Sequence, residues 1–473
     1  MSGAASQVIV PPERFGASVR ARLRFAHPGP LAPIGNNLVG LWQVETKGGP
    51  GLEAVFEDAE SVVRLVTALV PETVWPSANG VDVTRAEESR LRGRLASSEG
   101  WYAFGPAHAP SAVGAFRFPI GPVRGDVMES VGLTLTGMGD EVLGLRVDLG
   151  YKVRHVAHAA TGRPVADAAR VVGRATTTST GAHALAFAQA AEAAMGRAAS
   201  ARTGALRSIL AEIERVHSHL LDLASLAGST GLPTAQQELL AAREQVLRAA
   251  GALTGHRYMR DVVVPGGLES DAPNEAWRRA VGQVVALEAT VDRVFAQLGD
   301  TPSFLDRLNG AGIVLAQEAE AAGAVGPVGR ASGSGPDTRR YRPYAGYADH
   351  PPAPVRREHT GDAWARWRVK TAEVSASLRW LDEAAARLPE LDADREGQGP
   401  RAGWGLGRAE GPRGEIVYVV GVDEAAVTTR VSVRTASMRN WALMPAAVAR
   451  RNVLQDVPII DASFALSAAG SDM

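Results

Sequence analysis

The sequence predicts an α+β fold, in which a core bundle of long helices is flanked by β-hairpins and preceded by a small N-terminal α/β domain. Three observations predict it. Apolar residues recur at three- and four-residue steps over long stretches in the middle of the chain, which is typical of amphipathic helices. Short β-like runs bounded by turn signals lie before and after these stretches. The 473 residues also include 51 glycines and 28 prolines, enough for many turns between elements.

Length allows two to four domains at roughly 150 residues each. We place a boundary near residue 112, inside the proline-containing stretch 105–119, which is predicted to be a linker. Residues 1–112 then form the small domain and residues 113–473 the main domain. The small domain is predicted to contain two strands, a helix and a turn: 38–44, 52–56, 60–69 and Asn79-Gly80.

The main domain is predicted to contain two pairs of strands around five long helices. The strand pairs are 132–136 with 142–149, and 416–422 with 427–433. The helices are 180–195, 205–227, 237–253, 274–298 and 362–388. Asn274 and Asp362 are the expected caps of the last two helices. Helices 205–227, 274–298 and 362–388 are expected to pack side by side, because their apolar stripes need a common core. The stretches 323–347 and 390–403 are predicted to be loop and linker.

Composition excludes several classes of protein. Lys and Arg total 50 and Asp and Glu 51, so a general electrostatic binder of nucleic acid is disfavoured. We find neither an apolar run long enough to span a membrane nor a signal peptide, and we expect a cytoplasmic protein. The sequence contains no cysteine. Disulfides, cysteine-ligated zinc, iron–sulfur ligation by this chain and a thiol nucleophile are therefore excluded.

Local motifs alone do not define an active site. The phosphate-loop pattern is absent, and the glycine-rich run 403–411 is not a clean dinucleotide-binding motif. His217 and His219 are two residues apart on a predicted helix and point in different directions, so they cannot easily bind one metal ion. The hydroxyl residues 176–180 before His183 are explained by a helix cap.

Several strings, taken in order, resemble one family. They include Gly121-Pro-Val-Arg-Gly-Asp-Val-Met-Glu129, the helix Leu206 to Leu220, Gly329-Arg-Ala-Ser-Gly333, Pro412-Arg-Gly-Glu415 and Asn440-Trp441. Over residues 116–473 the chain resembles the large subunit of membrane-bound [NiFe] hydrogenases of the formate-hydrogenlyase type, and the 49-kDa (D) subunit of NADH:quinone oxidoreductase. The N-terminal domain is similar to a shortened 30-kDa (C) subunit of the same complex.

The resemblance implies that the metal site is lost. Hydrogenases of this family bind nickel and iron through two pairs of cysteines, whose positions fall on Thr176, Ser179, Ser467 and Gly470. Hydroxyl groups do not replace thiolates well as ligands of soft metals. We therefore expect no metal in this chain. The family's removal of a C-terminal peptide is not expected either, because the chain stops three residues after Gly470.

The resemblance also implies that the ordinary quinone site is lost. The two histidines of the quinone-binding relatives fall on Arg124 and Met128, the tyrosine on Thr177 and an acidic residue on Ser229. Arg124 and Thr177 are nevertheless expected to lie close together, near Ser179, Ser467 and Arg413. They would then be able to hydrogen-bond a quinone in place of the lost residues.

Some features of the family's site remain. Glu129 matches a glutamate used for proton transfer and Arg413 an arginine over the metal, so these two are the candidate catalytic residues. His183 is expected to line the same cavity. Two alternatives assign structural roles: Glu129 and Arg413 form a buried pair, or Arg124 closes the pocket by pairing with Glu129 or Asp126.

The resemblance implies a subunit of a membrane-associated respiratory-type oxidoreductase complex, peripheral on the inner face of the cell membrane. An iron–sulfur small subunit and membrane-arm subunits are the expected partners. No cofactor is expected in this chain except a quinone, and NAD would act only through the wider complex. The alternative is a structural docking subunit with a decayed active site. An isolated enzyme of unrelated activity is the third hypothesis.

Overall fold

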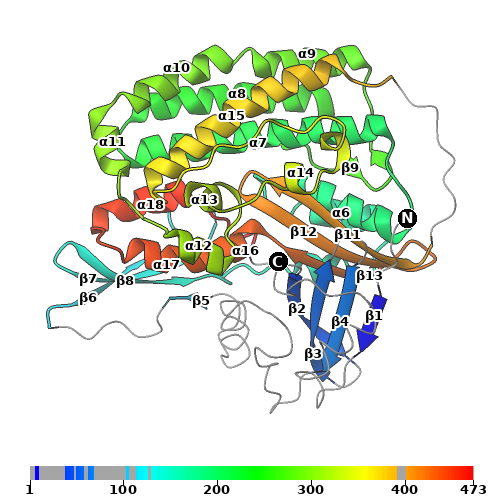
Figure 1. The fold of residues 1–473 in the computed structure, drawn as a ribbon, viewed down its shortest axis with the longest axis horizontal. Coiled ribbons are helices and arrows are strands. Elements are labelled where there is room, and N and C mark those ends of the chain that lie inside the picture. The colour runs from blue at the N-terminus through cyan, green and yellow to red at the C-terminus, as the bar shows by residue number, and fades with distance from the viewer. Residues whose placement is uncertain are drawn as a thin grey trace.

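A computed structural model describes residues 6–9, 38–46, 49–57, 62–68, 103–105, 113–125, 129–390 and 401–471. The N-terminal strands form a four-stranded sheet (Figure 1). Its strands are β1 Ser6–Ile9, β2 Leu38–Thr46, β3 Gly49–Glu57 and β4 Val62–Ala68, in the order β1-β4-β3-β2. Only β1 and β4 are parallel. The helix predicted at 60–69 is therefore wrong: this segment is rich in β-branched residues and pairs with β3. The turn at Asn79-Gly80 lies outside the described residues.

The predicted hairpin after residue 131 is confirmed, and it belongs to a second four-stranded sheet. The strands are β5 Ala103–Phe104, β6 Phe116–Ile120, β7 Gly132–Met138 and β8 Glu141–Asp148, in the order β5-β8-β7-β6. β7 is hydrogen-bonded along its length to β8, with Leu133 and Leu135 buried. β6 begins inside the stretch 105–119, which was predicted to be a linker.

The long helices form one bundle, as predicted (Figure 1). They are α6 Thr180–Ala194, α7 Ala201–Ser229, α8 Pro233–Thr254, α9 Asn274–Val285, α10 Glu288–Gly299 and α15 Ala363–Ala386. Both α7 and α9 pack on α8 and α15, and no strand layer separates these helices. Residues 274–298 form two helices instead of one, because the chain tightens at Ala286, whose N–H approaches the carbonyls of Gly282 and Val284.

The predicted helix caps differ in outcome. Asp362 caps α15 as predicted, with its carboxylate accepting the N–H of Ala365 at 2.8 Å. Asn274 does not cap α9, because the cap position is taken by Pro273. The side chain of Asn274 instead accepts a hydrogen bond from Arg202.

A third sheet lies against α6. Its strands are β11 Gly403–Gly411, β12 Gly414–Val422 and β13 Thr428–Arg434, in that order. β11 is the glycine-rich run. A Cβ atom on Gly405 or Gly407 would lie 1.9 or 2.0 Å from carbonyl oxygens of α6, so only glycine allows this contact. The run therefore packs a strand onto an alanine-rich helix and does not surround a nucleotide.

Short elements complete the main domain. The stretch 323–347, predicted to be a loop, contains α13 Gly326–Ala331, α14 Thr338–Tyr341 and the 3₁₀ helix η3 Ala345–Tyr347. The C-terminal part contains α16 Ala436–Asn440, η4 Trp441–Leu443, α17 Met444–Val448, η5 Leu454–Asp456 and α18 Val457–Phe464. The others are α4 Val156–Ala160, α5 Val165–Val172, β9 Val263–Val264, β10 Gly267–Leu268, α11 Pro302–Leu308 and α12 Ala316–Ala322.

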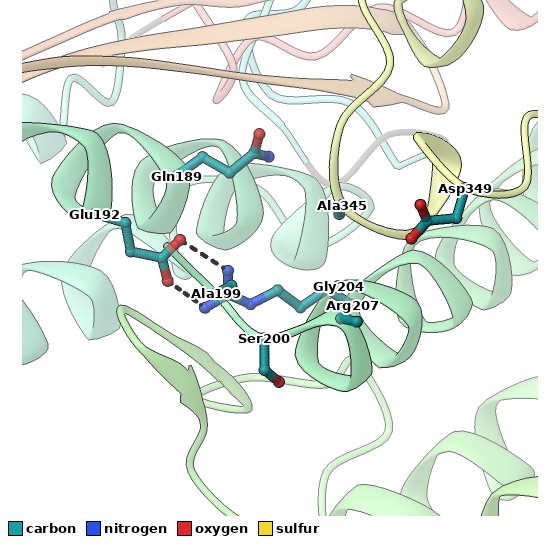
Figure 2. Close-up of a pocket in the computed structure, with 9 residues that line it drawn as sticks. Gln189, Glu192, Ala199, Ser200, Gly204, Arg207, Ala345 and Asp349 are labelled. Atoms are coloured by element: carbon teal, nitrogen blue, oxygen red, sulfur yellow. Dashed lines mark hydrogen bonds and ion pairs between the residues drawn. The ribbon is translucent and has the colours of Figure 1, made fainter. Parts of the chain in front are cut away.

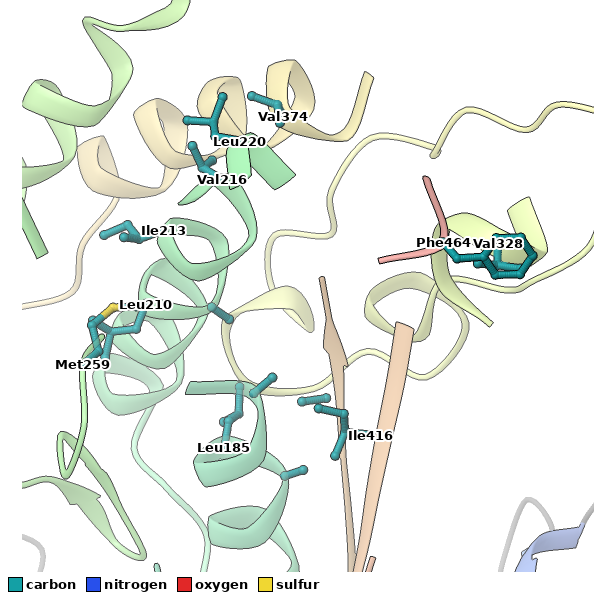
Figure 3. Close-up of a cluster of buried hydrophobic side chains, with 14 of the residues drawn as sticks. Leu185, Leu210, Ile213, Val216, Leu220, Met259, Val328, Val374, Ile416 and Phe464 are labelled. Carbon is teal, nitrogen blue, oxygen red and sulfur yellow. The ribbon is translucent and has the colours of Figure 1, made fainter. Parts of the chain in front are cut away.

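The core extends along α7. Figure 3 shows Leu210, Ile213, Val216 and Leu220 in line along this helix, with Val374 of α15 beside its C-terminal half. All five side chains are buried, which confirms the predicted apolar stripe. In the part of the chain that the structure describes, no helix is long and apolar enough to cross a bilayer.

Candidate functional site

The two segments expected to carry the family's metal-ligand positions meet in the structure. Thr176 and Ser179 precede α6, and Ser467 and Gly470 lie in the tail after α18. All four residues are buried. A Cβ atom on Gly470 would lie 3.3 Å from Ser467 Oγ and 3.5 Å from Thr176 Cγ2. The tail and the start of α6 are thus in contact at these positions.

The residues at these positions do not fit a nickel–iron centre. Hydroxyl groups stand at three of the positions and a glycine at the fourth, and none supplies a thiolate. Ser467 Oγ is already engaged, because it donates to the carboxylate of Glu129 and accepts the N–H of Gly470 at 2.9 Å. Across the described ranges, no group of three or more histidine or carboxylate side chains is placed to hold a metal ion.

Glu129 contacts the C-terminal tail. Its carboxylate accepts hydrogen bonds from Ser467 Oγ at 2.9 and 3.0 Å and from the N–H of Ala469 at 2.9 Å. The hypothesis of a buried pair between Glu129 and Arg413 is therefore wrong. The tail supplies both a hydroxyl and an amide donor to this carboxylate, and Arg413 has another acid as its partner.

Arg413 lies in the turn between β11 and β12 and joins three elements. Its guanidinium donates to Thr178 Oγ1 at 2.6 Å, to Ser218 Oγ of α7 at 3.4 Å and to Asp222 Oδ1 of α7 at 3.3 Å. It also donates to the carbonyl of Ala465 in the tail. Arg413 therefore fixes the start of α6, α7 and the tail relative to one another.

Arg124 is held at the tail side of this region. Its guanidinium lies 3.1 Å from the carboxylate of Asp461 on α18, and the two side chains are 10% and 18% exposed. The proposed closing pair with Glu129 is wrong, because the partners of Glu129 are Ser467 and Ala469. The other proposed partner, Asp126, lies outside the described residues, as does Met128. Thr177 is half-buried beside Thr176.

Two of the predicted pocket residues, His183 and Ser229, make contacts elsewhere in the structure. His183 is 1% exposed in the contact between α6 and β12, and its Nδ1 lies 2.8 Å from the hydroxyl of Tyr418. Burial lowers the pKa of His183 to about 3, with a further contribution from Arg154, so this imidazole is neutral. Ser229 is the last residue of α7 and donates to the carbonyl of Leu226. It lies about 10 Å beyond Asp222 along the helix.

A buried set of charged residues lies on α7 and was not predicted from the sequence motifs. Glu212, Arg215, His219 and Asp222 are at most 4% exposed. They recur at three- and four-residue steps, the spacing that places side chains on one helix face. The buried set could have been predicted from this spacing. Four ionisable residues that lie between the residues of an apolar stripe are buried with it and need charged or polar partners.

Arg330 of α13 is the centre of this buried charge network. Its guanidinium lies 2.8 Å from the carboxylate of Glu373 on α15 and 2.9 Å from that of Glu410 on β11. His219 Nε2 lies 3.0 Å from the other oxygen of Glu373. Burial alone would raise the pKa of Glu373, but Arg330 and His219 hold it well below its usual range. Burial raises the pKa of Glu410 despite Arg330.

Two further pairs extend the network in both directions along α7. Asp222 accepts a hydrogen bond from Lys370 of α15 at 3.0 Å. Burial would raise the pKa of Asp222, but Lys370 and Arg413 hold it well below its usual range. At the other end, Glu212 binds Arg339 at 2.8 Å and the hydroxyl of Tyr347 at 2.5 Å. A continuous set of buried charges thus connects the region of Arg413 with α13 and α14.

A separate cavity of about 310 Å³ lies between α6, the start of α7 and the segment around η3 (Figure 2). Glu192 and Arg207 form a two-fold ion pair on its wall, with distances of 2.6 and 3.1 Å. Gln189, Ser200 and Asp349 are its other polar residues. It contains none of the predicted site residues.

Comparisons with known proteins agree with this fold. The family described as the respiratory-chain NADH dehydrogenase 49 Kd subunit matches residues 230–400. The carbon monoxide-induced hydrogenase of Rhodospirillum rubrum is 26% identical over 348 residues, covering 73% of this chain and 96% of its own length. Formate hydrogenlyase subunit 5 of Escherichia coli is 30% identical over 285 residues, covering 60% of this chain and 50% of its own length.

Two further relatives complete the comparison. The 49-kDa-type (D) subunit of the NADH-quinone oxidoreductase of Akkermansia muciniphila is 28% identical over 309 residues, 59% of this chain and 74% of its own length. The fold matches a chain of the membrane-bound sulfane sulfur reductase, an archaeal respiratory membrane complex, with a TM-score of 0.70. That match has 22% identity and covers 77% of this chain and 100% of the other.

Fold and relatives together define the class of protein. The chain is a homologue of the large subunits of membrane-bound hydrogenases and of the 49-kDa (D) subunit of NADH-quinone oxidoreductase. These homologues are subunits of membrane-bound oxidoreductase complexes of electron transport. The resemblance and the fold class predicted from the sequence are therefore confirmed.

Proposed function

We propose that this chain is a subunit of a membrane-associated oxidoreductase complex of the respiratory type, and that it carries no metal centre of its own. One observation supports this most directly. The positions expected to hold the ligands come together, yet Ser467 Oγ donates to the carboxylate of Glu129 and accepts the N–H of Gly470. Electron transfer in such a complex would use centres in other subunits.

The expected neighbours are an iron–sulfur small subunit and membrane-arm subunits. With no cysteine, the chain cannot ligate an iron–sulfur cluster through thiolates, so electrons would arrive from a partner. NAD would act only through the wider complex. The proposed location is the cytoplasmic, inner face of the cell membrane, with contact to the membrane through partner subunits.

The hydrogen-bond arrangement favours a second candidate, a docking subunit without a reactive site. A quinone headgroup needs donors, and the guanidinium of Arg413 already donates to Thr178, Ser218 and Asp222. Arg124 is likewise engaged by Asp461. A quinone would have to displace these partners before Arg413 or Arg124 could donate to it. A structural role requires no such rearrangement of hydrogen bonds.

Purification of the tagged chain from its native membranes tests the proposal. Mass spectrometry should find an iron–sulfur subunit and integral membrane subunits at stoichiometric amounts, and the preparation should contain iron but no nickel. Recovery of the chain alone from membranes and soluble fraction would contradict the proposal. Binding of a quinone analogue to the assembled complex, compared between wild type and Arg124→Ala, separates the two candidates: loss of binding in the variant supports a quinone site.

A further inference from the structure

His217 on α7 is a fully buried imidazole without a hydrogen-bond partner. Its exposure is 0%, and both ring nitrogens lack a partner among the described residues. Burial, together with Arg243 of α8, lowers the pKa of this histidine to about 3. The ring is therefore neutral, with one N–H donor and one acceptor nitrogen. Buried polar atoms in folded proteins are almost always paired, so an absent binding partner is indicated here.

The surroundings of His217 supply further unused donors. The ring of Tyr258 lies edge-on to it, with 6.0 Å between ring centroids. Figure 3 shows the neighbouring Met259 against α7, so the segment after α8 runs along this helix. Arg243 and Arg260 are both half-buried, and the Nε atoms of both have no partner among the described residues.

The acids of this region are already paired with other cations. Glu244 of α8 binds both Arg248 and Arg257. Asp261 binds Arg174 at 2.5 Å. Asp222, four residues beyond Ser218 on α7, binds Lys370 and Arg413. The charge of Arg243 beside His217 is therefore not offset by these acids, and Arg260 follows Tyr258 by two residues in the chain.

We propose that His217, Arg243 and Tyr258 form a binding site for a small oxyanion, a carboxylate or a phosphate. A guanidinium presents parallel N–H groups that match two oxygens of such an anion. The tyrosine hydroxyl and the N–H of the neutral imidazole complete the donor set. The anion would give the buried histidine its missing partner and neutralise the unpaired arginine.

Anion titrations of the full chain test this site. Inorganic phosphate and acetate are titrated separately by calorimetry, at an ionic strength held constant with chloride, so that the two arms distinguish phosphate from carboxylate. Wild type should bind at least one of them in a saturable way, and the ring signals of carbon-13-labelled His217 should shift on binding. Arg243→Gln should weaken binding at least tenfold.

Arg248→Gln is the matched control, because it removes the same charge from the same helix at an exposed, paired position. Its affinity should equal that of wild type. If Arg243→Gln does not fold, Tyr258→Phe replaces it, since that change removes only a hydroxyl and should weaken binding several-fold. No saturable binding by wild type, or equal weakening in the Arg248→Gln control, would overturn the proposal. The result does not depend on nickel content or on partner subunits.

Discussion

The buried carboxylate of Glu214 allows a direct test of how one ionisable group changes the free energy of unfolding with pH. This residue of α7 is 1% exposed and accepts hydrogen bonds from the N–H groups of Gly181 and Ala182, in the first turn of α6. It acts as a cap supplied by another helix, because the cap residue Ser179 makes no side-chain bond of its own to α6. The perturbation is Glu214→Gln, which removes the charge and keeps the shape.

The magnitude follows from the pKa of this group. Burial raises the pKa of Glu214 to about 7, although the two N–H donors and Arg215 act in the opposite direction. In the window between the ordinary value of 4.5 and 7, the folded state binds more protons than the unfolded state. Stability from this group therefore falls as pH rises through that window, by about 3 kcal/mol in all.

Urea unfolding of both proteins between pH 4 and 8 is the assay. The free energy of unfolding of wild type, minus that of Glu214→Gln, should decrease by about 3 kcal/mol from pH 4 to pH 8. Other titrating groups cancel in this difference. Gln237→Ala, which removes no titratable group from an exposed position of α8, is the control and should give a flat difference. Parallel profiles for wild type and Glu214→Gln would refute the argument, because they would mean that Glu214 has the same pKa in both states.

Three further predictions follow from the site. Protein made in nickel-supplied cells should contain no nickel by elemental analysis, and near-stoichiometric nickel would show that the ligand argument is wrong. Arg330→Met should cost about 3–5 kcal/mol in urea unfolding, because it leaves Glu373 and Glu410 without their shared cation; a loss below about 1 kcal/mol would contradict the role of the network. Glu129→Gln and Ser467→Ala should each destabilise the protein and speed proteolysis of the tail, with a coupling of about 1 kcal/mol in the double variant. Additive effects would show that the hydrogen bond between them contributes little.

The helical core could be predicted from the pattern of apolar residues. The three- and four-residue spacing of apolar residues placed α7 and its buried face correctly, because such a stripe is stable only when covered. The prediction of a single helix over 274–298 was wrong. The apolar periodicity continues across Ala286, but the backbone tightens there and separates two helices. Strand β4 was missed because a short apolar run does not distinguish helix from strand.

The absence of cysteine was equally decisive. Composition alone removes thiolate ligands, and no arrangement of the chain can restore them. The contact between Thr176 and Gly470 was also expected from the resemblance, which places both segments at one site.

The pairing of the buried charges could not be predicted, because it depends on how distant elements pack. Glu129 was expected beside Arg413, yet it binds Ser467, 338 residues away in sequence. Arg413 itself binds Asp222. Helical spacing shows which face of a helix a charge occupies, but its partner comes from whichever distant element packs there. A buried charge is stable only with such a partner, so the pairing was fixed by the packing of α7, α15, β11 and the C-terminal tail.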